Sequence, residues 1–188
     1  MYDCIDCHST LRKKSNRIST DRRRMSEEGG IRMKIRQTKD ASEIALLNRP
    51  VHDRHVERYP QYFKPYHQGA MTRFFEQKVD HPSYFFFLAK VERKPVGYLW
   101  LEHRTYEENV FKSAYTSLYV HQISLNEEER GKGYGRQMME HVETVAQEIG
   151  ADEIELDYWV ENKEAKRFYE RNGYRIRREF VYKTLREE

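Results

Sequence analysis

Apolar and charged residues alternate along residues 31–38, with Ile31, Met33 and Ile35 on one face of the chain. A period of two is typical of a half-buried β-strand. Residues 92–95 have the composition of a turn and predict a hairpin between the apolar stretches on either side of them. The further predicted strands cover residues 83–91, 96–105, 117–125 and 152–160, with one more strand or a hairpin over residues 174–185.

A helical period of three to four residues replaces this alternation in four segments. Residues 39–48 begin with Asp40 and Glu43 at the spacing of a capping box, and Pro50 is expected to end or kink this helix. A second helix is predicted over residues 66–79. The remaining two are an amphipathic helix with its stripe at Met138, Val142, Val145 and Ile149, and a short helix that Asn162 caps and Asn172 and Gly173 end.

The resulting order is β-α-α-β-β-β-α-β-α-β, which predicts an α/β sandwich built mainly on a mixed sheet. A chain of 188 residues is expected to form one compact domain, and we place it at residues 31–188. Residues 1–30 have few large apolar residues and no hydrophobic period. We therefore expect a disordered basic leader or extension there.

The distribution of charge limits the function classes. Residues 1–32 hold eight Lys or Arg and five Asp or Glu, out of 34 and 31 in the whole chain, so the remainder is neutral. A neutral body argues against nucleic acid as a partner, because that function needs a basic face. No run of 18 apolar residues is present, so we expect no membrane span. The basic N-terminus lacks the apolar region of a secretory signal, which favours a cytoplasmic location.

Both cysteines lie in the motif Cys4-x-x-Cys7-His8. This spacing occurs in c-type haem attachment sites, so a covalent haem is one interpretation. The other is a leader with free thiols in a reducing cytoplasm, because no export signal accompanies the motif. Two cysteines and one histidine are too few for a structural zinc site, and we expect no metal.

A loop rich in glycines and cations follows the strand at residues 117–125 and precedes the amphipathic helix. Backbone N–H groups at such a helix N-terminus have no internal partner, and the helix dipole favours an anion there. The loop lacks the Gly-Lys-Ser/Thr end of a Walker A motif and the third glycine of a dinucleotide-binding fingerprint. Its residues leave two interpretations open, a solvated turn and a phosphate-binding loop.

Two motifs in this order resemble those of the GCN5-related N-acetyltransferases (GNAT). The first, Gln/Arg-x-x-Gly-x-Gly/Ala, corresponds to residues 130–135. The second motif, Asn-x-x-Ala-x-x-Phe-Tyr-x-x-x-Gly-Phe/Tyr, corresponds to Asn162, Ala165, Phe168, Tyr169, Gly173 and Tyr174. The resemblance spans roughly residues 33–185 and implies a mixed, mostly antiparallel twisted sheet flanked by helices, with two strands splayed apart to form the acetyl-CoA cleft.

The resemblance also implies that acetyl-CoA is the acetyl donor and that an amine attacks it directly in a ternary complex. Loop amides would hold the pyrophosphate, the preceding strand would pair with the pantetheine arm, and an amide near Leu125 would polarise the thioester carbonyl. Asn162 would contact pantetheine or a bridging water, or it only caps its helix. The implied cofactor-binding residues are Ile123, Ser124, Leu125, Arg130, Gly131, Lys132, Gly133, Tyr134, Gly135, Arg136 and Asn162.

Two side chains are the implied catalytic residues. Tyr169 would protonate the departing CoA thiolate, because a phenol keeps its proton at neutral pH yet can donate it; the alternative is a core tyrosine. Many relatives carry a glutamate on the strand before the loop, whereas this sequence has His121 at about that place, with Gln122 beside it. Histidine titrates near neutral pH and can take the proton of the amine. Otherwise it is a sheet residue, and water takes this proton.

The first two predicted helices and their connection are implied to wall the acceptor site. We expect transfer to a primary amine of a small molecule; acetylation of a protein N-terminus or lysine and a non-catalytic CoA-binding sensor are the alternatives. An exposed edge at the C-terminal strand would allow two copies to pair as a homodimer. Tyr59, Tyr62, Phe63 and Tyr66 form either an aromatic wall or part of the core, and Glu102, Glu107 and Glu108 either face solvent or favour a cationic acceptor such as a polyamine.

Overall fold

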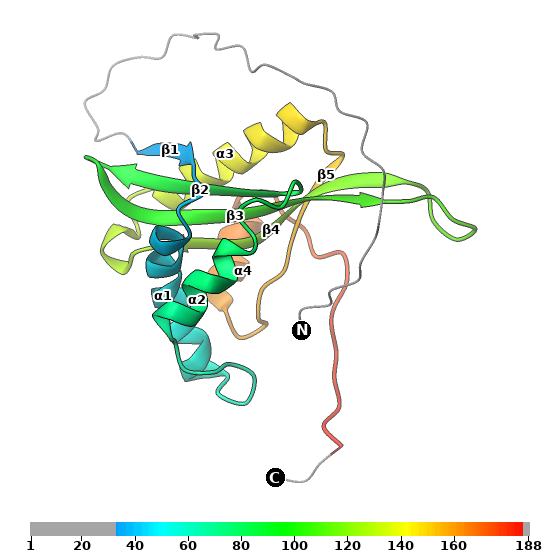
Figure 1. Cartoon of the computed structure of the whole chain (residues 1–188). Coiled ribbons are helices and arrows are strands. Elements are labelled where there is room, and N and C mark those ends of the chain that lie inside the picture. Colours follow the sequence, from blue (N-terminus) through cyan, green and yellow to red (C-terminus); the bar gives the residue numbers. More distant parts are fainter. Residues whose placement is uncertain (1–32, 186–188) are drawn as a thin grey trace. The chain divides into compact units, whose positions relative to one another are not determined.

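The computed structural model describes residues 33–185 (Figure 1). The leader predicted at residues 1–30 and the motif from Cys4 to His8 lie outside the described residues. A five-stranded sheet forms the centre, and its strands follow one another in chain order. They are β1 (Lys34–Gln37), β2 (Tyr84–Val91), β3 (Lys94–Tyr106), β4 (Tyr115–Leu125) and β5 (Glu153–Leu156). The first four strands are antiparallel and β5 is parallel to β4, which confirms the predicted mixed, mostly antiparallel α/β fold.

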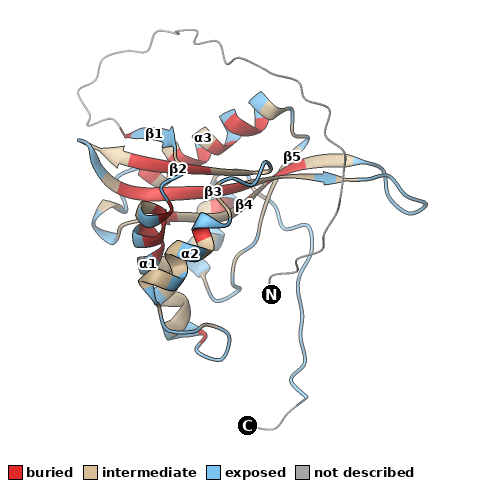
Figure 2. Ribbon diagram, viewed as in Figure 1, coloured by how far each residue is buried: buried red, intermediate tan, exposed pale blue. Residues whose placement is uncertain are grey.

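Helices cover both faces of this sheet. Alternate residues of β3 face opposite sides: Tyr98 and Trp100 pack with the first two helices, whereas Leu99 and Leu101 pack with the third. Figure 2 shows the buried residues along the sheet and on the inward side of these helices. The helices are α1 (Ala41–Arg58), α2 (Gln68–Glu76), α3 (Tyr134–Ile149) and α4 (Lys163–Arg171), and a 3-10 turn, η1 (Glu127–Glu129), precedes α3.

The first helix begins as predicted but is longer than predicted. The Asp40 side chain accepts a hydrogen bond from the Glu43 amide and caps α1. The helix then continues through Pro50 to Arg58, so an end at Pro50 is wrong. Ring contacts hold the added turns, since His52 and His55 pack on Phe63 of the following loop. A proline costs a helix one backbone hydrogen bond, and these contacts offset that loss.

Two predicted strands differ from the structure. The strand expected at residues 152–160 ends at Leu156, because the chain beyond it leaves the sheet and Trp159 stacks on Tyr59 with ring centroids 4.0 Å apart. No strand or hairpin forms at residues 174–185, which are extended and largely exposed. Among the described residues, no helix is both long and apolar enough to cross a membrane.

Candidate active site

The glycine-rich loop joins β4 to α3, and its backbone shape depends on two glycines. After η1 the chain is extended at Arg130, and Gly131 and Gly133 then adopt φ values of +75° and +82°. Glycine takes up this left-handed region without strain, whereas a residue with a Cβ does not. Gly133 is the N-cap of α3, so the helix starts immediately after the turn.

Six consecutive backbone amides, at residues 131–136, donate no hydrogen bond to any atom of the described residues. The first amide of α3 that finds a backbone acceptor belongs to Gln137, which donates to the Gly133 carbonyl at 3.2 Å. A cluster of free N–H groups at the positive end of a helix dipole is suited to bind an anion. Of the two interpretations of the loop, the phosphate-binding one fits this geometry.

The cations of the loop are all held in ion pairs. Lys132 Nζ lies 3.0 Å from Glu129, and Arg136 Nε lies 3.0 Å from Glu140. Arg130 contacts Glu127 at 3.5 Å and also donates to the Leu125 carbonyl at 3.4 Å. The backbone amides of the loop are therefore free to bind an anion. Its cationic side chains could bind the anion only after they leave their glutamate partners.

The start of α3 packs closely on α4. Tyr134 is buried in the core, and a Cβ placed on Gly135 would lie 3.3 Å from the Phe168 ring. The side-chain oxygen of Asn162 caps α4 by accepting a hydrogen bond from the Ala165 amide at 3.1 Å. The predicted capping role of Asn162 is therefore present in the structure.

The neighbouring strands β4 and β5 pair over only part of their length. Their register covers four residues of β4, from Ser117 to Val120, which face Glu153 to Leu156 of β5. Beyond Val120 the side of β4 that faces β5 has no strand partner within the described residues. The two strands are therefore splayed apart, as the resemblance of the two motifs implied. The splay leaves an unpaired backbone edge at residues 121–125.

A β-bulge lies where this splay begins. Leu101 of β3 pairs with Val120, and Trp100 pairs with Gln122, so His121 is the extra residue. A bulge re-aims side chains and changes which face the following residues occupy. Beyond it Ile123 and Leu125 pack in the core beneath α3, whereas Ser124 turns to α1 and donates to the Leu47 carbonyl at 2.9 Å. These three residues can therefore contact a ligand mainly through their backbone.

Gln122 is occupied in a structural contact. Its side-chain oxygen accepts a hydrogen bond from Asn48 of α1 at 2.8 Å and another from the Tyr98 hydroxyl. Asn48 is buried, and its amide nitrogen also donates to Tyr98 at 2.9 Å. The network fixes α1 against β3 and β4, and it leaves His121 as the titratable side chain at the bulge.

His121 lies in an aromatic and acidic environment. Its Nε2 is 2.7 Å from Glu102 Oε2, and its ring stacks on Trp100 with centroids 4.3 Å apart. The rings of Tyr84 and Tyr119 contact it edge-on. When the neutral imidazole donates its Nε2 proton to Glu102, Nδ1 carries the lone pair and can accept a proton.

Glu102 is held by two donors. Arg104 Nε lies 2.7 Å from the same Oε2 that contacts His121. Burial by itself would raise the pKa of Glu102, but the hydrogen bonds from His121 and Arg104 outweigh it and lower this pKa below its ordinary value. Glu102 is thus a charged partner of His121, whereas Glu107 and Glu108, predicted with it as one acidic group, are exposed in the loop after β3.

Tyr169 lies on α4 and is buried in the core cluster with Leu118 and Val120. Its ring stacks on Tyr158 with centroids 5.8 Å apart, and its hydroxyl makes no hydrogen bond to another described residue. Burial, followed by the negative charge of Asp157, raises the pKa of Tyr169 to about 12. The phenol therefore stays protonated, as an acid must.

One residue that the sequence analysis did not select packs against the aromatic side chains predicted as a wall. Trp159, from the segment after β5, stacks on Tyr59 and Tyr62 and meets the Phe63 ring edge-on. The Tyr59 hydroxyl also donates to Glu161 at 2.8 Å. None of these side chains belongs to the two core clusters, although Tyr59 is buried, and together they join the α1–α2 loop to the β5–α4 loop. Trp159 lies within the strand predicted at residues 152–160, and a tryptophan in a predicted strand gives no signal for this role.

No group of three His, Cys, Asp or Glu side chains within residues 33–185 is arranged to hold a metal ion. The structure defines an α/β protein whose split sheet is followed by a helix N-terminus with free backbone amides. A model described as the acetyltransferase (GNAT) family matches residues 51–174, which is more than half of the chain. The chain belongs to this family.

Solved structures share the fold. A tetramutant of the BH1408 protein from Bacillus halodurans is 25% identical with a TM-score of 0.76, covering 81% of this chain and 99% of its own. AAC(6')-Iy, in complex with the bisubstrate analog CoA-S-monomethyl-acetylneamine, is 15% identical with a TM-score of 0.62, covering 82% and 99%. The aminoglycoside antibiotic 6'-N-acetyltransferase AAC(6')-Ih from Acinetobacter baumannii is 16% identical with a TM-score of 0.62, covering 83% and 99%. A comparison with curated proteins finds no significant match.

Proposed function

We propose that this chain transfers an acetyl group from acetyl-CoA to a primary amine of a small molecule, by direct attack with both substrates bound. The observation that carries the proposal is the run of six free amides at residues 131–136, which follows the unpaired edge of β4 after the η1 turn. The first feature suits a pyrophosphate and the second suits an extended amide-bearing arm. Membership of the GNAT acetyltransferase family supports the same chemistry.

The residues that would hold acetyl-CoA fit its chemistry. Backbone amides of Gly131, Lys132, Gly133, Tyr134, Gly135 and Arg136 would hold the pyrophosphate, and the backbone of Ile123, Ser124 and Leu125 would pair with the pantetheine arm. When bound, acetyl-CoA supplies an acyl carbon activated as a thioester. A backbone amide of β4 near Leu125 would donate to the thioester carbonyl oxygen and favour the negative charge that develops there.

The amine must lose a proton before it attacks, and His121 is the group we assign to take it. Nε2 lies 2.7 Å from Oε2 of Glu102, and when it donates its proton to that carboxylate, Nδ1 is the atom that accepts the proton of the amine. The bulge at His121 is what places this side chain next to the unpaired edge of β4.

Tyr169 is the group we assign to return a proton to the departing thiolate. Its pKa of about 12 keeps the phenol protonated at neutral pH, and its hydroxyl is not engaged by another described residue. His121 lies on the face of the sheet that α1 and α2 cover, where it stacks on Trp100. Tyr169 packs on the opposite face, in the core cluster that includes α3. Beyond Val120 the two strands β4 and β5 separate, which opens the sheet between these two faces. Base and acid would therefore approach the reaction from opposite faces of the sheet.

The acceptor side favours a cationic amine. Glu102 lies at the bulge, Asp157 accepts from Tyr119 at 2.5 Å, and Glu161 accepts from Tyr59 in the aromatic wall. Carboxylates and aromatic faces both attract an alkylammonium group. Two structural neighbours are named for aminoglycoside acetylation or hold an acetylneamine analog, which supports a small-molecule amine as the class of acceptor.

An acceptor panel tests this assignment. The full chain is incubated with acetyl-CoA and with polyamines, aminoglycosides, or peptides that carry a free N-terminus or a lysine, and acetylated products are identified by mass spectrometry. Products from small amines alone support the proposal. Products from peptides alone would make the chain a protein acetyltransferase, and CoA binding without any product would make it a sensor.

A further inference from the structure

Arg104 and His121 bind the same oxygen atom of one carboxylate. Nε of Arg104 lies 2.7 Å from Oε2 of Glu102, and Nε2 of His121 lies 2.7 Å from the same Oε2. An ionised carboxylate has two oxygens and several acceptor positions, so it could serve two donors in many orientations. Two donors on a single oxygen restrict it to one. The direction in which Glu102 points therefore depends on Arg104 as well as on His121.

The Arg104 side chain is itself held in place by its neighbours. Its guanidinium carbon lies 3.5 Å from the centre of the Tyr119 ring, and the Tyr119 hydroxyl donates a hydrogen bond to Asp157. Tyr106 follows Arg104 on the same face of β3 and also interacts with its side chain. A stacked guanidinium with fixed neighbours loses little freedom when it binds a carboxylate. Arg104 is therefore oriented before any substrate arrives.

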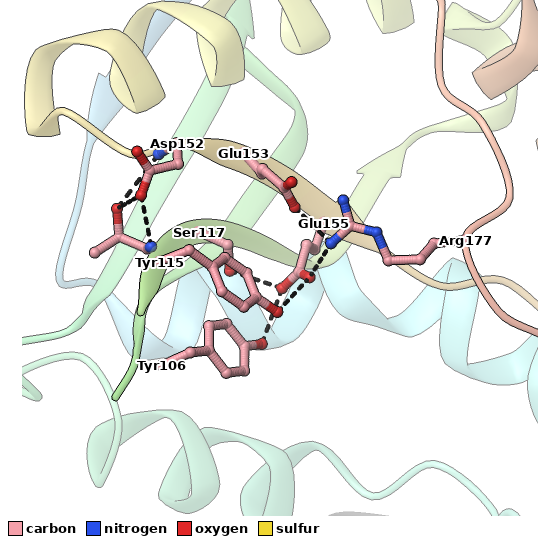
Figure 3. Close-up of polar contacts among 8 residues, drawn as sticks. Tyr106, Tyr115, Ser117, Asp152, Glu153, Glu155 and Arg177 are labelled. Atoms are coloured by element: carbon pink, nitrogen blue, oxygen red, sulfur yellow. Dashed lines mark hydrogen bonds and ion pairs between the residues drawn. The ribbon is translucent and has the colours of Figure 1, made fainter. Parts of the chain in front are cut away.

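Tyr106 is fixed in turn by a carboxylate of β5. Its hydroxyl donates to Glu155 at 2.9 Å, and the buried Ser117 donates to the same carboxylate at 2.7 Å (Figure 3). A second guanidinium lies at the far end of this network, because Arg177 Nη1 is 2.6 Å from Glu153 and 3.5 Å from Glu155 (Figure 3). The same face of the sheet thus carries two guanidinium–carboxylate contacts, and only one of them involves the partner of His121.

Burial makes the contact of Arg104 with Glu102 consequential. The side chains of Arg104, Glu102 and His121 are 31%, 19% and 16% exposed, so Arg104 is the member of the group nearest to solvent. Burial by itself would raise the pKa of Glu102, and the hydrogen bonds from His121 and Arg104 lower it. Of these two donors, Arg104 is the one that is charged at every pH. Without it, Glu102 can turn toward water or gain a proton, and His121 then loses its acceptor.

We infer that Arg104 is a positioning residue for the base: it holds Glu102 so that Nε2 of His121 keeps its proton and Nδ1 stays free to accept one. The inference rests on the proposed function, in which His121 takes the proton of the amine. A neutral imidazole can carry its proton on either nitrogen, and the hydrogen bond that one nitrogen makes decides between the two tautomers. When Glu102 no longer faces Nε2, the imidazole also populates the tautomer whose Nδ1 carries the proton and cannot act as a base.

Nitrogen-15 NMR of the histidine rings tests the positioning on the full chain without any reaction. At about pH 8.5, where an ordinary imidazole is neutral, the ring nitrogens distinguish the two tautomers, and the signals of His121 are those that His121→Gln lacks. We expect the proton on Nε2 in the wild type and a mixture of tautomers in Arg104→Gln. Arg177→Gln is the matched control, because it removes a guanidinium from the carboxylates of β5, and it should leave His121 unchanged. An unchanged tautomer in Arg104→Gln would overturn the inference.

Steady-state kinetics test whether Arg104 acts through His121. Arg104→Gln should lower kcat/KM about tenfold in the wild-type chain, but change it less than about twofold in the His121→Gln chain, where no base remains to be positioned. Arg104→Lys should recover part of the loss, because lysine still donates to the carboxylate. Circular dichroism verifies that all variants keep the fold.

The outcomes separate the two claims. An equal loss of kcat/KM in both chains means that Arg104 acts by another route, and it overturns the inference even if the tautomer changes. If no amine is acetylated at all, the proposed function falls, while the NMR spectra still decide whether Arg104 positions His121.

Discussion

Nε2 of His121 lies 2.7 Å from Oε2 of Glu102, although the two residues come from neighbouring strands and His121 is the extra residue of a bulge. The bulge also lets Gln122 face α1, where Asn48 and Tyr98 bind it, so one irregularity serves both a structural contact and a titratable pair. When the neutral imidazole donates its Nε2 proton to Glu102, the other ring nitrogen of His121 is free to accept a proton, which is the role we propose for it.

Replacement of His121 by glutamine should lower kcat/KM about 10²-fold at neutral pH, because the amine then loses its proton without a positioned base. The ratio of wild-type to variant kcat/KM should fall as pH rises toward the titration range of the amine, because more acceptor is then already neutral. Initial rates from pH 6 to pH 10 measure this ratio. A constant ratio across that range would remove His121 from the role of base.

Replacement of Glu102 by glutamine should reduce the loss of unfolding free energy that occurs as the pH falls into the acid range. The pKa of Glu102 is lowered in the folded state, so its charged form adds stability above the ordinary glutamate range, and this stability is lost as pH falls below that range. From about pH 5 to about pH 3 the wild type should lose more unfolding free energy than the variant. Urea unfolding measures this, with Glu107→Gln at an exposed position as control. If Glu102→Gln and Glu107→Gln lose the same unfolding free energy over this pH range, the charged form of Glu102 does not stabilise the fold as described.

The sequence predicted the elements whose pattern is local. The capping residues Asp40 and Asn162 lie where their spacing placed them, and the glycine-rich loop starts α3 as expected. Patterns set by distant contacts were not predictable. Pro50 indicated a helix end, yet ring contacts with the following loop keep the helix intact.

The residues of the candidate site also fall into those that local sequence patterns predict and those that depend on distant contacts. Motif spacing identified the loop and Tyr169, because both depend on residues close together in the chain. Glu102 was predicted only as one of three acids, since its contact with His121 depends on a bulge that shifts strand register. Trp159 was missed for a similar reason: the α1–α2 loop that it packs against is far from it in sequence. The absent C-terminal strand had the right apolar composition but has no partner strand within the described residues.

Replacement of Tyr169 by phenylalanine should lower kcat about tenfold to a hundredfold while the melting temperature changes little, because the hydroxyl has no partner among the described residues. Tyr174→Phe is the matched control. Its ring contacts Tyr169 at 5.8 Å, and its buried hydroxyl also lacks a partner within residues 33–185. If both variants lose kcat equally, the effect comes from packing, and Tyr169 is not the acid.

Replacement of Gly133 by alanine should destabilise the chain by about 1 kcal/mol and weaken CoA binding about tenfold or more, because a Cβ at φ of +82° strains the turn that aims the free amides. Calorimetric titration with CoA and urea unfolding measure the two effects. Gly69→Ala in α2 is the control, since its nearest contacts would be 3.6 Å and a helical alanine stabilises by roughly 0.5–1 kcal/mol. Unchanged CoA affinity in Gly133→Ala would place the phosphate elsewhere.

Release of free thiol from acetyl-CoA in the presence of small primary amines tests the central claim most directly. The account predicts release that depends on both the amine and the protein, and that falls strongly in His121→Gln and Tyr169→Phe while Tyr174→Phe retains it. Tight binding of CoA with no thiol release above the buffer rate for any amine would contradict it.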